Sequence, residues 1–455
     1  MKIVVIGMGK IGQTIIEELC GEGHELTAID LNPKKIEDIV NNYDVQGIVG
    51  NGVNYDIQME AGVKNAELVI AAAATDEINM LACLVAEKIG AAHTVARIRD
   101  PEYSRQFSFM LDTMGLDMVV NPEFETASEI SRNLRYPSAV KIDTFSKGRI
   151  ELVEYRIGES CPLNGMALSK ISSRLNVRVL VCAVQRKEQV IIPGGDFVLT
   201  AGDRIYFTAA HSEMPGFFKA MGEYKEKPHH MMLIGGGRIA YYLARQLSDA
   251  GMRVKVIERD RDRCVELTEL LPRASVICGE GTNPSLLREE NLAGCDACVA
   301  ITGIDEENVM ISLYAKKLGV PKILTKINKT TLSDMLGGML EEIGLDSIIS
   351  PRQLTANRIV RYVRAMEGTE GSSMQTLYRL VGGRVEALEF KVEGDSALTG
   401  RPLRELSLKP DMLITCINRG GEIIIPGGGD CIRRGDHVIV VAVANRIRAL
   451  GDILR

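Results

Sequence analysis

The chain has 455 residues, of which 45% are hydrophobic and 25% are charged, and its formal net charge is −6. A chain this long exceeds the roughly 250–300 residues that one hydrophobic core serves, so we expect several domains. The acidic balance argues against a general nucleic-acid or anionic-membrane surface. No apolar run approaches the ~18–20 residues that span a bilayer, and the first one meets a glycine too early for a signal peptide.

The first part of the chain alternates short apolar runs with helical patterns, which predicts a parallel sheet covered on both faces. The predicted strands are Lys2–Ile6, Glu25–Ile29, Val45–Val49, Leu68–Ala72, His93–Ile98 and Met118–Val120. The predicted helices are Lys10–Cys20, Pro33–Asn41, Asn54–Ala61, Glu77–Ile89 and Glu102–Met114, and then a long helix Asn121–Arg135 that opens with Asn-Pro. The expected fold is α/β, with a doubly wound, Rossmann-like sheet.

From about residue 140 to residue 222 the pattern changes to short alternating strands. The segment Ile191–Ala209 reads IIPGGDFVLTAGDRIYFTA, in which a Pro-Gly-Gly turn precedes a Gly-Asp turn. Turns of this kind predict tight hairpins. We therefore expect a small, β-rich α+β domain after the nucleotide-type fold.

The second half of the chain repeats the first. Gly7 corresponds to Gly235, which lies 228 residues further along the chain. The segment Ile424–Ala442 repeats the Pro-Gly-Gly and Gly-Asp turns. A repeat of this length is too long for a solenoid unit of about 20–50 residues, so it indicates a duplicated pair of domains. The predicted nucleotide-type domains are 1–138 and 229–366, the predicted small domains are 139–222 and 374–455, and the predicted linkers include Gly222–His230 and Gly368–Ser373.

Phosphate and ribose contacts are predicted where the first strand meets the first helix. In GMGKIG the first glycine allows a sharp turn, the second lets the backbone approach a pyrophosphate, and the third allows helix and strand to pack closely. Asp30, at the end of the second strand, would accept hydrogen bonds from ribose hydroxyls, which favours NAD over NADP. The candidate residues are Gly7, Met8, Gly9, Lys10, Ile11, Gly12, Asp30, Asn51, Gly52, Thr75 and Arg97.

The second nucleotide-type domain repeats this pattern, with alanine as an accepted variant of the last glycine. Its candidate residues are Gly235, Gly237, Arg238, Ile239, Ala240, Glu258, Glu280, Thr302 and Lys326. Arg259 follows the acid directly and makes the preference for NAD less clear. A cation follows the second glycine in both domains, Lys10 in the first and Arg238 in the second. Each either reaches toward phosphates or lies exposed in the first helical turn. Arg97 and Lys326 either face the ligand or form surface ion pairs.

The sequence predicts neither a catalytic site nor a metal site. A dehydrogenase needs an acid or base beside the nicotinamide, and none of the six histidines falls at the predicted carboxyl edge of the sheet in both halves. Cys295 and Cys298 have CxxC spacing, but no second ligand pair accompanies them. We expect Cys298 to lie in a buried strand instead. Ten cysteines without an export signal suggest reduced thiols.

These motifs together resemble the RCK (KTN) family, in the tandem arrangement of the TrkA-type regulatory subunits of bacterial Trk potassium uptake systems. The resemblance covers essentially the whole chain. Its motifs are GMGKIG with Asp30, GNG at 50–52, TDEINM at 75–80, ARIRDPEY at 96–103, the Asn-Pro helix and both Pro-Gly-Gly segments. Asn51, where the family usually has Asp, and Ala240 depart from the pattern.

The resemblance implies a cytoplasmic sensor without enzymatic activity, peripheral at the inner face of the membrane. Binding of NAD(H), ATP or ADP would change the shape of a homotetrameric ring and bias a TrkH- or TrkG-type potassium channel subunit between open and closed. The small domains would pair or bind a second effector, such as a cyclic dinucleotide. Two alternatives stay open at this point: an NAD-dependent oxidoreductase, and a nucleotide-sensing regulator of another ion transporter.

The two long helices, Asn121–Arg135 and Pro351–Met366, carry apolar faces. Their apolar residues at helical spacing are Phe124, Ile130, Leu134, Leu354, Ile359 and Val363. These faces either pack against another copy of the chain or pack within the same chain.

Overall fold

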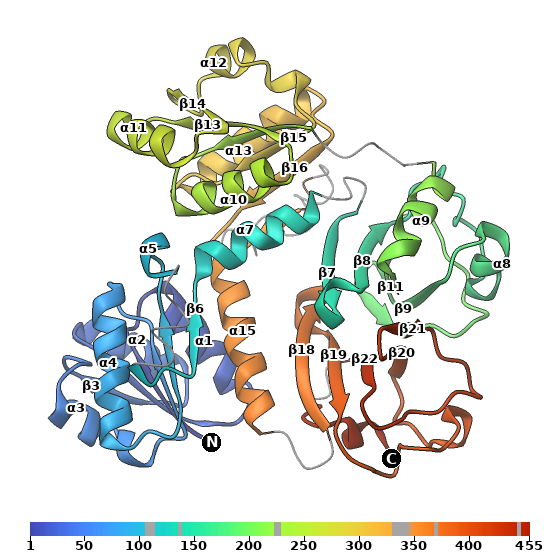
Figure 1. The fold of residues 1–455 in the computed structure, drawn as a ribbon, viewed down its shortest axis with the longest axis horizontal. Coiled ribbons are helices and arrows are strands. Elements are labelled where there is room, and N and C mark those ends of the chain that lie inside the picture. The colour runs from blue at the N-terminus through green and yellow to red at the C-terminus, as the bar shows by residue number, and fades with distance from the viewer. Residues whose placement is uncertain are drawn as a thin grey trace. The chain divides into compact units, whose positions relative to one another are not determined.

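A computed structural model of the chain describes residues 1–104, 114–134, 139–222, 229–329, 345, 347–367, 372–443 and 447–455 (Figure 1). These residues form two compact units. The first contains Met1–Ser128 with Ser350–Val360, and the second contains Glu129–Ile349 with Arg361–Arg455. One nucleotide-type sheet belongs to the first unit, whereas the other and both small-domain sheets belong to the second.

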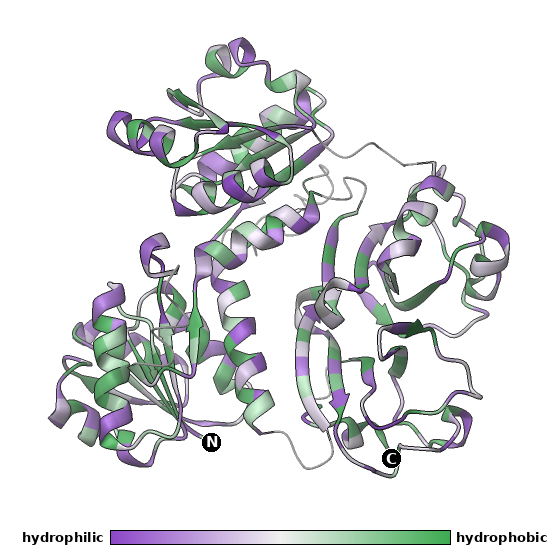
Figure 2. Ribbon diagram, viewed as in Figure 1, coloured by the Kyte–Doolittle hydropathy of each residue, from purple (hydrophilic) through white to green (hydrophobic). Residues whose placement is uncertain are grey.

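The first sheet has six parallel strands in the order β3-β2-β1-β4-β5-β6, and its strands are hydrophobic along most of their length (Figure 2). The strands are β1 (Lys2–Ile6), β2 (Glu25–Asp30), β3 (Gln46–Val49), β4 (Leu68–Ala71), β5 (Thr94–Arg97) and β6 (Met118–Val120). The helices are α1 (Lys10–Cys20), α2 (Pro33–Asn42), α3 (Tyr55–Glu60), α4 (Asp76–Ile89) and α5 (Pro101–Ser104). The predicted doubly wound fold is confirmed, although most of the predicted helix Glu102–Met114 lies outside the described residues.

The second nucleotide-type sheet repeats this topology in the order β14-β13-β12-β15-β16-β17. Its strands are β12 (His230–Ile234), β13 (Arg253–Glu258), β14 (Ala274–Cys278), β15 (Ala297–Ala300), β16 (Lys322–Lys326) and β17 (Ile348–Ile349). Its helices are α10 (Arg238–Asp249), α11 (Arg261–Leu270), α12 (Pro284–Glu289) and α13 (Asp305–Lys317). Cys298 lies fully buried in β15, as the sequence predicts.

Each small domain has a five-stranded antiparallel sheet, and the two sheets share one topology: β10-β9-β11-β8-β7 and β21-β20-β22-β19-β18. The first contains β7 (Lys141–Phe145), β8 (Ile150–Arg156), β9 (Val179–Arg186), β10 (Gln189–Ile191) and β11 (Arg204–Ala210), with helices α8 (Ile171–Leu175) and α9 (Met214–Ala220). The second contains β18 (Ser372–Leu380), β19 (Val385–Val392), β20 (Met412–Arg419), β21 (Glu422–Ile424) and β22 (His437–Val443). Because β12 begins at His230 and β18 begins at Ser372, the predicted linkers Gly222–His230 and Gly368–Ser373 run one and two residues into a strand. The other domain boundaries stay predictions.

The two small domains pack against each other through one hydrophobic core. Phe145 and Tyr206 of the first belong to the same buried cluster as Leu380 and Cys416 of the second. The aromatic rings of Phe145 and Tyr378 meet edge to face, 5.1 Å between centroids. The small domains thus pair within a single chain.

The long helices are α7 (Pro122–Asn133) and α15 (Pro351–Met366). Their apolar faces pack within the chain, because Ile130, Leu134, Ile359 and Val363 are at most 2% exposed. For these four residues the structure supports packing within the chain rather than a face left for another copy. Leu354 is half-buried, and Phe124 is 44% exposed. The predicted end of the first helix, Arg135, lies outside the described residues.

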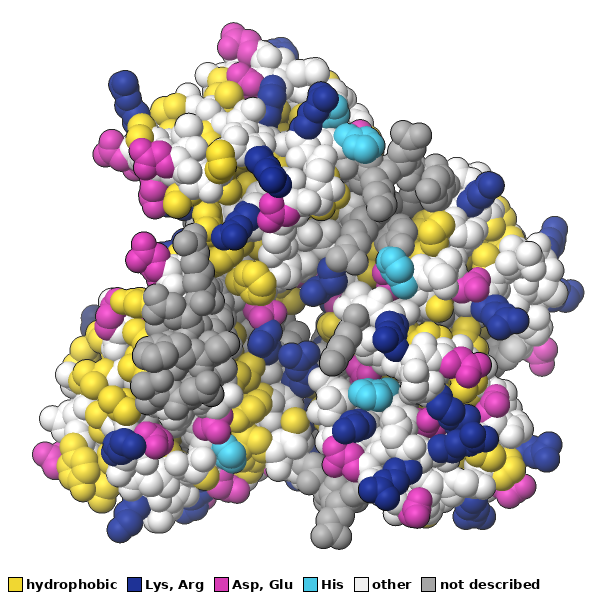
Figure 3. All heavy atoms as spheres, in the orientation of Figure 1, with side chains coloured by type: hydrophobic (Ala, Val, Ile, Leu, Met, Phe, Trp, Pro, Cys, Tyr) yellow, Lys and Arg dark blue, Asp and Glu magenta, His cyan; other side chains and the backbone are white. Residues whose placement is uncertain are grey.

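The surface carries both signs of charge. On the face drawn in Figure 3, acidic and basic side chains are interspersed rather than gathered by sign. Within the described ranges, no helix is both long enough and apolar enough to cross a membrane.

Glycines at two positions let β1 pass directly into α1. Gly7 has a φ of +96°, and a Cβ there would lie 2.5 Å from the backbone nitrogen of Ala73. A Cβ on Gly12 would lie 1.9 Å from the carbonyl oxygen of Gly7. In the second domain the buried Ala240 takes the place of Gly12. The second loop therefore leaves room for one methyl group that the first loop excludes.

A bidentate ion pair closes the Gly-Asp turn of each small domain. In the first, two guanidinium nitrogens of Arg186 donate to Asp203, at 2.8 and 2.7 Å. In the second, Arg419 donates to Asp436 at 2.9 and 2.8 Å. Burial alone would raise the pKa of Asp203, but hydrogen bonds from Arg186 and Thr200 outweigh it and hold that pKa below its usual value.

We expect Asp203→Asn to destabilise the protein by about 2 kcal/mol, because Arg186 loses the carboxylate of a charge-assisted bidentate pair. The pKa of Asp203 is lower in the folded state. The stabilisation is therefore complete above the unfolded-state pKa and is lost as the pH falls through the folded-state pKa. Denaturant unfolding from about pH 7 to about pH 3 should show a weaker acid dependence in the variant. Asp436→Asn is the matched variant, and unchanged unfolding free energies in both would contradict this role.

Gly12→Ala should destabilise the protein by about 1–3 kcal/mol, because the added methyl group forces the loop away from α1. Thermal unfolding of the full chain measures the effect. The matched control is Ala240→Gly, which creates no clash and should cost only about 0.5–1 kcal/mol, as glycine does within a helix. Equal effects of the two substitutions would show that the two loops have the same room.

Candidate functional site

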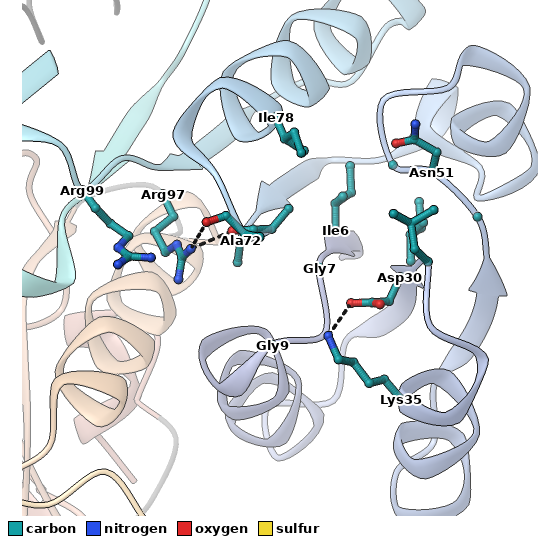
Figure 4. A pocket seen from close by; sticks show the side chains of 16 residues that line it. Ile6, Gly7, Gly9, Asp30, Lys35, Asn51, Ala72, Ile78, Arg97 and Arg99 are labelled. Atoms are coloured by element: carbon teal, nitrogen blue, oxygen red, sulfur yellow. Dashed lines mark hydrogen bonds and ion pairs between the residues drawn. The ribbon is translucent and has the colours of Figure 1, made fainter. Parts of the chain in front are cut away.

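A cleft of about 550 Å³ opens at the carboxyl edge of the first sheet (Figure 4). This is the edge at which doubly wound folds bind ligands. The segments that follow β1, β2, β3, β4 and β5 supply its walls. The lining residues are Ile6, Gly7, Gly9, Ile29, Asp30, Leu31, Lys35, Gly50, Asn51, Gly52, Ala72, Ala73, Ala74, Ile78, Arg97 and Arg99.

The N-terminus of α1 lies at this cleft without a side-chain cap. Its N-cap residue is Gly9, which has no side chain to accept from the first-turn amides. In contrast, the side chains of Asn32, Asn54 and Thr75 cap the three following helices, α2, α3 and α4. Open amides and the helix dipole favour an anion such as a phosphate group. In the second domain α10 begins in the same way, after Gly237.

The carboxylate at the end of β2 anchors the glycine loop. Asp30 accepts from the backbone N–H of Met8 at 2.7 Å with Oδ2 and from that of Asn32 at 2.8 Å with Oδ1. Lys35 Nζ approaches Oδ2 at 3.3 Å, as Figure 4 shows. Each carboxylate oxygen has further acceptor capacity, so the group can also receive ribose hydroxyls.

Glu258 has the same role in the second domain. Its Oε2 accepts from the N–H of Gly236 at 2.6 Å, and its Oε1 accepts from the N–H of Asp260 at 2.8 Å. A longer acid therefore performs the same double anchoring. Both halves hold a carboxylate against the loop that would carry the phosphates.

A buried asparagine joins two neighbouring strand ends in each nucleotide-type domain. Asn79 is fully buried, and its side chain accepts from the N–H of Ala73 at 2.7 Å and donates to the carbonyl of Arg97 at 2.8 Å. Asn308 makes the matching bonds with the N–H of Thr302 at 2.8 Å and the carbonyl of Lys326 at 3.0 Å. Asparagine supplies both a donor and an acceptor, which this position needs. These residues hold β4 and β5 in register at the ligand edge.

Two arginines at the end of β5 line the first cleft. A guanidinium nitrogen of Arg97 donates to the carbonyl of Ala73 at 2.6 Å (Figure 4). Arg99 pairs through Nε with Glu123 at 2.9 Å. In the second domain Lys326 donates to the carbonyl of Thr302. The first domain therefore holds its two arginines in place along the lining of the cleft.

The structure brings several predicted residues of the first domain to the cleft and places the others behind it. Gly7, Gly9, Asp30, Asn51, Gly52 and Arg97 line it. Met8 and Gly12 are buried beneath the loop, Ile11 is half-buried, and Lys10 is exposed on the first turn of α1. Thr75 caps α4 by accepting from the N–H of Ile78 at 3.4 Å. Leu31, Lys35, Ile78 and Arg99 were not predicted, because they lie outside the glycine fingerprint.

In the second domain Gly235 and Gly237 flank the loop that Glu258 anchors, while Ile239 and Ala240 are buried behind it. Arg238 and Glu280 are exposed, and Glu280 accepts from the hydroxyl of Thr282 at 3.3 Å. Thr302 occupies the position of Ala73 rather than that of Thr75, because its N–H binds Asn308 as that of Ala73 binds Asn79.

The two domains differ at the outer end of the site. Leu31 and Val49, which are 69% and 48% exposed in the first domain, correspond to the exposed Arg259 and Cys278 in the second. Arg263 replaces Lys35, and its Nε donates to the carbonyl of Gly236 at 2.8 Å. The first domain thus presents an apolar outer end and the second a polar one.

Comparison with known proteins matches both halves. The TrkA-N domain model matches residues 3–122 and 231–351, and the TrkA-C domain model matches 152–222 and 387–455. The Trk system potassium uptake protein TrkA of Vibrio alginolyticus is 31% identical over 97% of this chain and 96% of its own length. The TrkA homolog 1 of Methanosarcina mazei is 32% identical over 98% of each chain.

The fold is similar to that of solved structures. The GsuK channel bound to NAD has a TM-score of 0.63 at 18% identity, over 97% of this chain and 77% of that chain. GsuK bound to ADP has a TM-score of 0.51 at 15% identity, over 80% of this chain and 69% of that chain. The domain matches and the relatives of nearly equal length show that the chain belongs to the TrkA family of Trk system potassium uptake proteins.

Proposed function

We propose that this protein is a nucleotide-sensing regulatory subunit of a potassium uptake system. The observation that carries the proposal is the pairing, in both halves, of an uncapped helix N-terminus with a carboxylate anchored one strand away. The helix N-terminus favours phosphate groups, and the carboxylate favours ribose hydroxyls. Membership of the TrkA family supports the connection to potassium uptake.

The residues of the first cleft fit NAD(H). The amides after Gly9 would hold the pyrophosphate, and Asp30 would hold the adenosine ribose. Leu31 and Ile78 offer apolar surface to the adenine ring. A bound dinucleotide would extend past Ala73 and Arg97, which line the cleft, toward the end of β5. The GsuK channel, a structure of similar fold, was solved with NAD bound, which supports this assignment.

In the second domain we propose an adenine mononucleotide, ADP or ATP. Glu258 would bind its ribose, and the exposed Arg238 and Arg259 would meet phosphate oxygens. A structure of similar fold was solved with ADP, which supports the class of ligand. The two sites would then report on different nucleotides in one chain.

The polar groups of the first cleft suit binding rather than catalysis. Both oxygens of Asp30 accept backbone N–H groups, so this carboxylate is arranged as a fixed acceptor. Arg97 and Arg99 bind a carbonyl and a carboxylate of the protein. A ligand held in this way can shift an equilibrium between two conformations by its difference in affinity for them, typically about 1–3 kcal/mol.

The proposed partner is a TrkH- or TrkG-type potassium channel subunit in the membrane. The chain would act from the cytoplasm as a homotetramer bound to the inner face of that subunit. Nucleotide binding would change the shape of this assembly and bias the channel between open and closed. The family to which the chain belongs supports a potassium transporter as the partner class.

Calorimetric titration of the purified chain tests the two ligand assignments. Asp30→Ala should weaken NAD(H) binding by about tenfold or more, because a hydrogen bond to a charged group is worth roughly 1.5–3 kcal/mol. Glu258→Ala should weaken ADP or ATP binding by a similar factor and leave NAD(H) binding unchanged. The exposed Glu25, on the same strand as Asp30, provides the control variant Glu25→Ala.

Three outcomes of this titration would count against the proposal. Equal loss of one ligand in both variants would contradict the division between the sites. If the wild-type chain bound none of NAD, NADH, ADP and ATP, the nucleotide-type domains would not be nucleotide sensors. Consumption of NADH, followed by its absorbance in the presence of a metabolite extract, would indicate an oxidoreductase instead.

A further inference from the structure

Two thiols lie together beside the carboxylate of the second nucleotide-type domain. Cys264 Sγ donates to the carbonyl oxygen of Glu258 at 3.2 Å, and the N–H of Gly279 donates to the same oxygen at 2.8 Å. Glu258 and Cys278 are register partners in β13 and β14. The thiols of Cys264 and Cys278 are also near enough that Cys278 raises the pKa of the Cys264 thiol, and neither forms a disulfide in this structure.

The two thiols differ in exposure. Cys264 is buried on α11 and only 7% exposed. Of the ten cysteines, all of which fall in the described ranges, Cys278 is the only exposed one. An oxidant in solution therefore reaches Cys278 first, and Cys264 is the neighbouring thiol whose pKa it raises.

The first domain shows which part of this arrangement packing explains. At the equivalent positions it has Ile36 and Val49, and Ile36 packs over Gly47. The second domain has Val276 where the first has Gly47, so a smaller residue at 264 leaves room for valine. Packing accounts for a small side chain at 264 but not for a thiol at the exposed position 278.

We propose that Cys264 and Cys278 form a reversible disulfide on exposure to a peroxide, and that this bond weakens nucleotide binding in the second domain. The sulfur of Cys278 attacks one oxygen of the peroxide and the O–O bond breaks. The other oxygen takes the thiol proton and departs as water, and Cys278 becomes a sulfenic acid. The sulfur of Cys264 then attacks the sulfur of Cys278, the S–O bond breaks, and the departing hydroxide takes the Cys264 proton. With hydrogen peroxide, two thiols and one peroxide thus give one disulfide and two waters.

The surroundings of Cys264 assign the order of these steps. Burial, followed by the contact with Cys278 and the charges of Glu258 and Asp260, raises the pKa of the Cys264 thiol to about 11. Because the thiolate is the reactive form, the raised pKa slows the reaction of Cys264 with an oxidant in solution. A sulfenic acid on the neighbouring Cys278 is held close to Cys264, and this proximity offsets the small thiolate fraction.

The disulfide would act on the site through the start of α11. A disulfide requires an S–S distance of about 2.0 Å, so the two sulfurs must approach each other, which would draw α11 toward β14. At this end of α11, Asp260 donates its N–H to Glu258 at 2.8 Å and Arg263 donates to the carbonyl of Gly236 at 2.8 Å. Movement of α11 therefore displaces the carboxylate and the loop together. This consequence rests on the proposed function of the second site.

Peptide mapping of the full chain tests the bond itself. After treatment with hydrogen peroxide, mass spectrometry without reduction should find Cys264 linked to Cys278, and dithiothreitol should reverse the link. Cys264→Ser and Cys278→Ser should each abolish it. The CxxC pair is the internal control, because Cys298 is fully buried and should stay reduced. Absence of the Cys264–Cys278 peptide, or equal linkage of Cys295 to Cys298, would overturn the proposal.

Titration with ADP tests the consequence for binding. In an Asp30→Ala background, which leaves the second site to report, the oxidised chain should bind ADP about fivefold more weakly or worse than the reduced chain. Cys278→Ser should bind ADP equally before and after peroxide. Equal affinity of the oxidised and reduced chains would overturn the proposed effect on binding. If the reduced chain bound no ADP in its second domain, the proposed function would fail there, while the peptide map would still decide whether the disulfide forms.

Discussion

The contact on which both ligand sites depend joins a carboxylate at the end of one strand to a backbone amide at the end of its neighbour. Asp30 holds Met8, and Glu258 holds Gly236. Strand pairing aligns the two strands, and the carboxylate adds a hydrogen bond to the glycine loop beyond their ends. In the first domain this carboxylate lines the same cleft as Gly9 at the uncapped helix terminus. One group therefore shapes the phosphate loop and is available to ribose.

Duplication preserved this framework and changed its periphery. Asn79 and Asn308 make the same bonds at the ligand edge, and the ion pairs of Asp203 and Asp436 close the same turns in the small domains. The differences gather at the outer end of the site, where apolar residues in the first half correspond to an arginine and a cysteine in the second. Buried polar groups resist change because each must keep its hydrogen-bond partners, whereas exposed positions can vary.

Much of the fold could be predicted from the sequence because its strands are apolar runs and its helices carry start and stop signals. The fingerprint also located Gly7, Gly9 and Asp30 at the cleft. Lys35, Ile78 and Arg99 escaped prediction because helix and strand geometry brings them there without a spacing motif. Thr302 illustrates a different limit of sequence analysis. Its position at a strand end predicts that it lies at the ligand edge. Only the hydrogen bond from its N–H to Asn308 identifies it as the counterpart of Ala73. The contact between Cys264 and Cys278 likewise depends on packing between a helix and a strand.

The central claim is that nucleotide binding to this chain controls potassium movement through a membrane partner. The most direct test is potassium flux through the co-purified channel subunit in proteoliposomes, measured with and without the chain and with NAD(H), ADP or ATP. The account predicts that nucleotides change the flux only when the chain is present, and that Asp30→Ala removes the response to NAD(H). A flux that ignores nucleotides in the presence of a nucleotide-bound chain would contradict it.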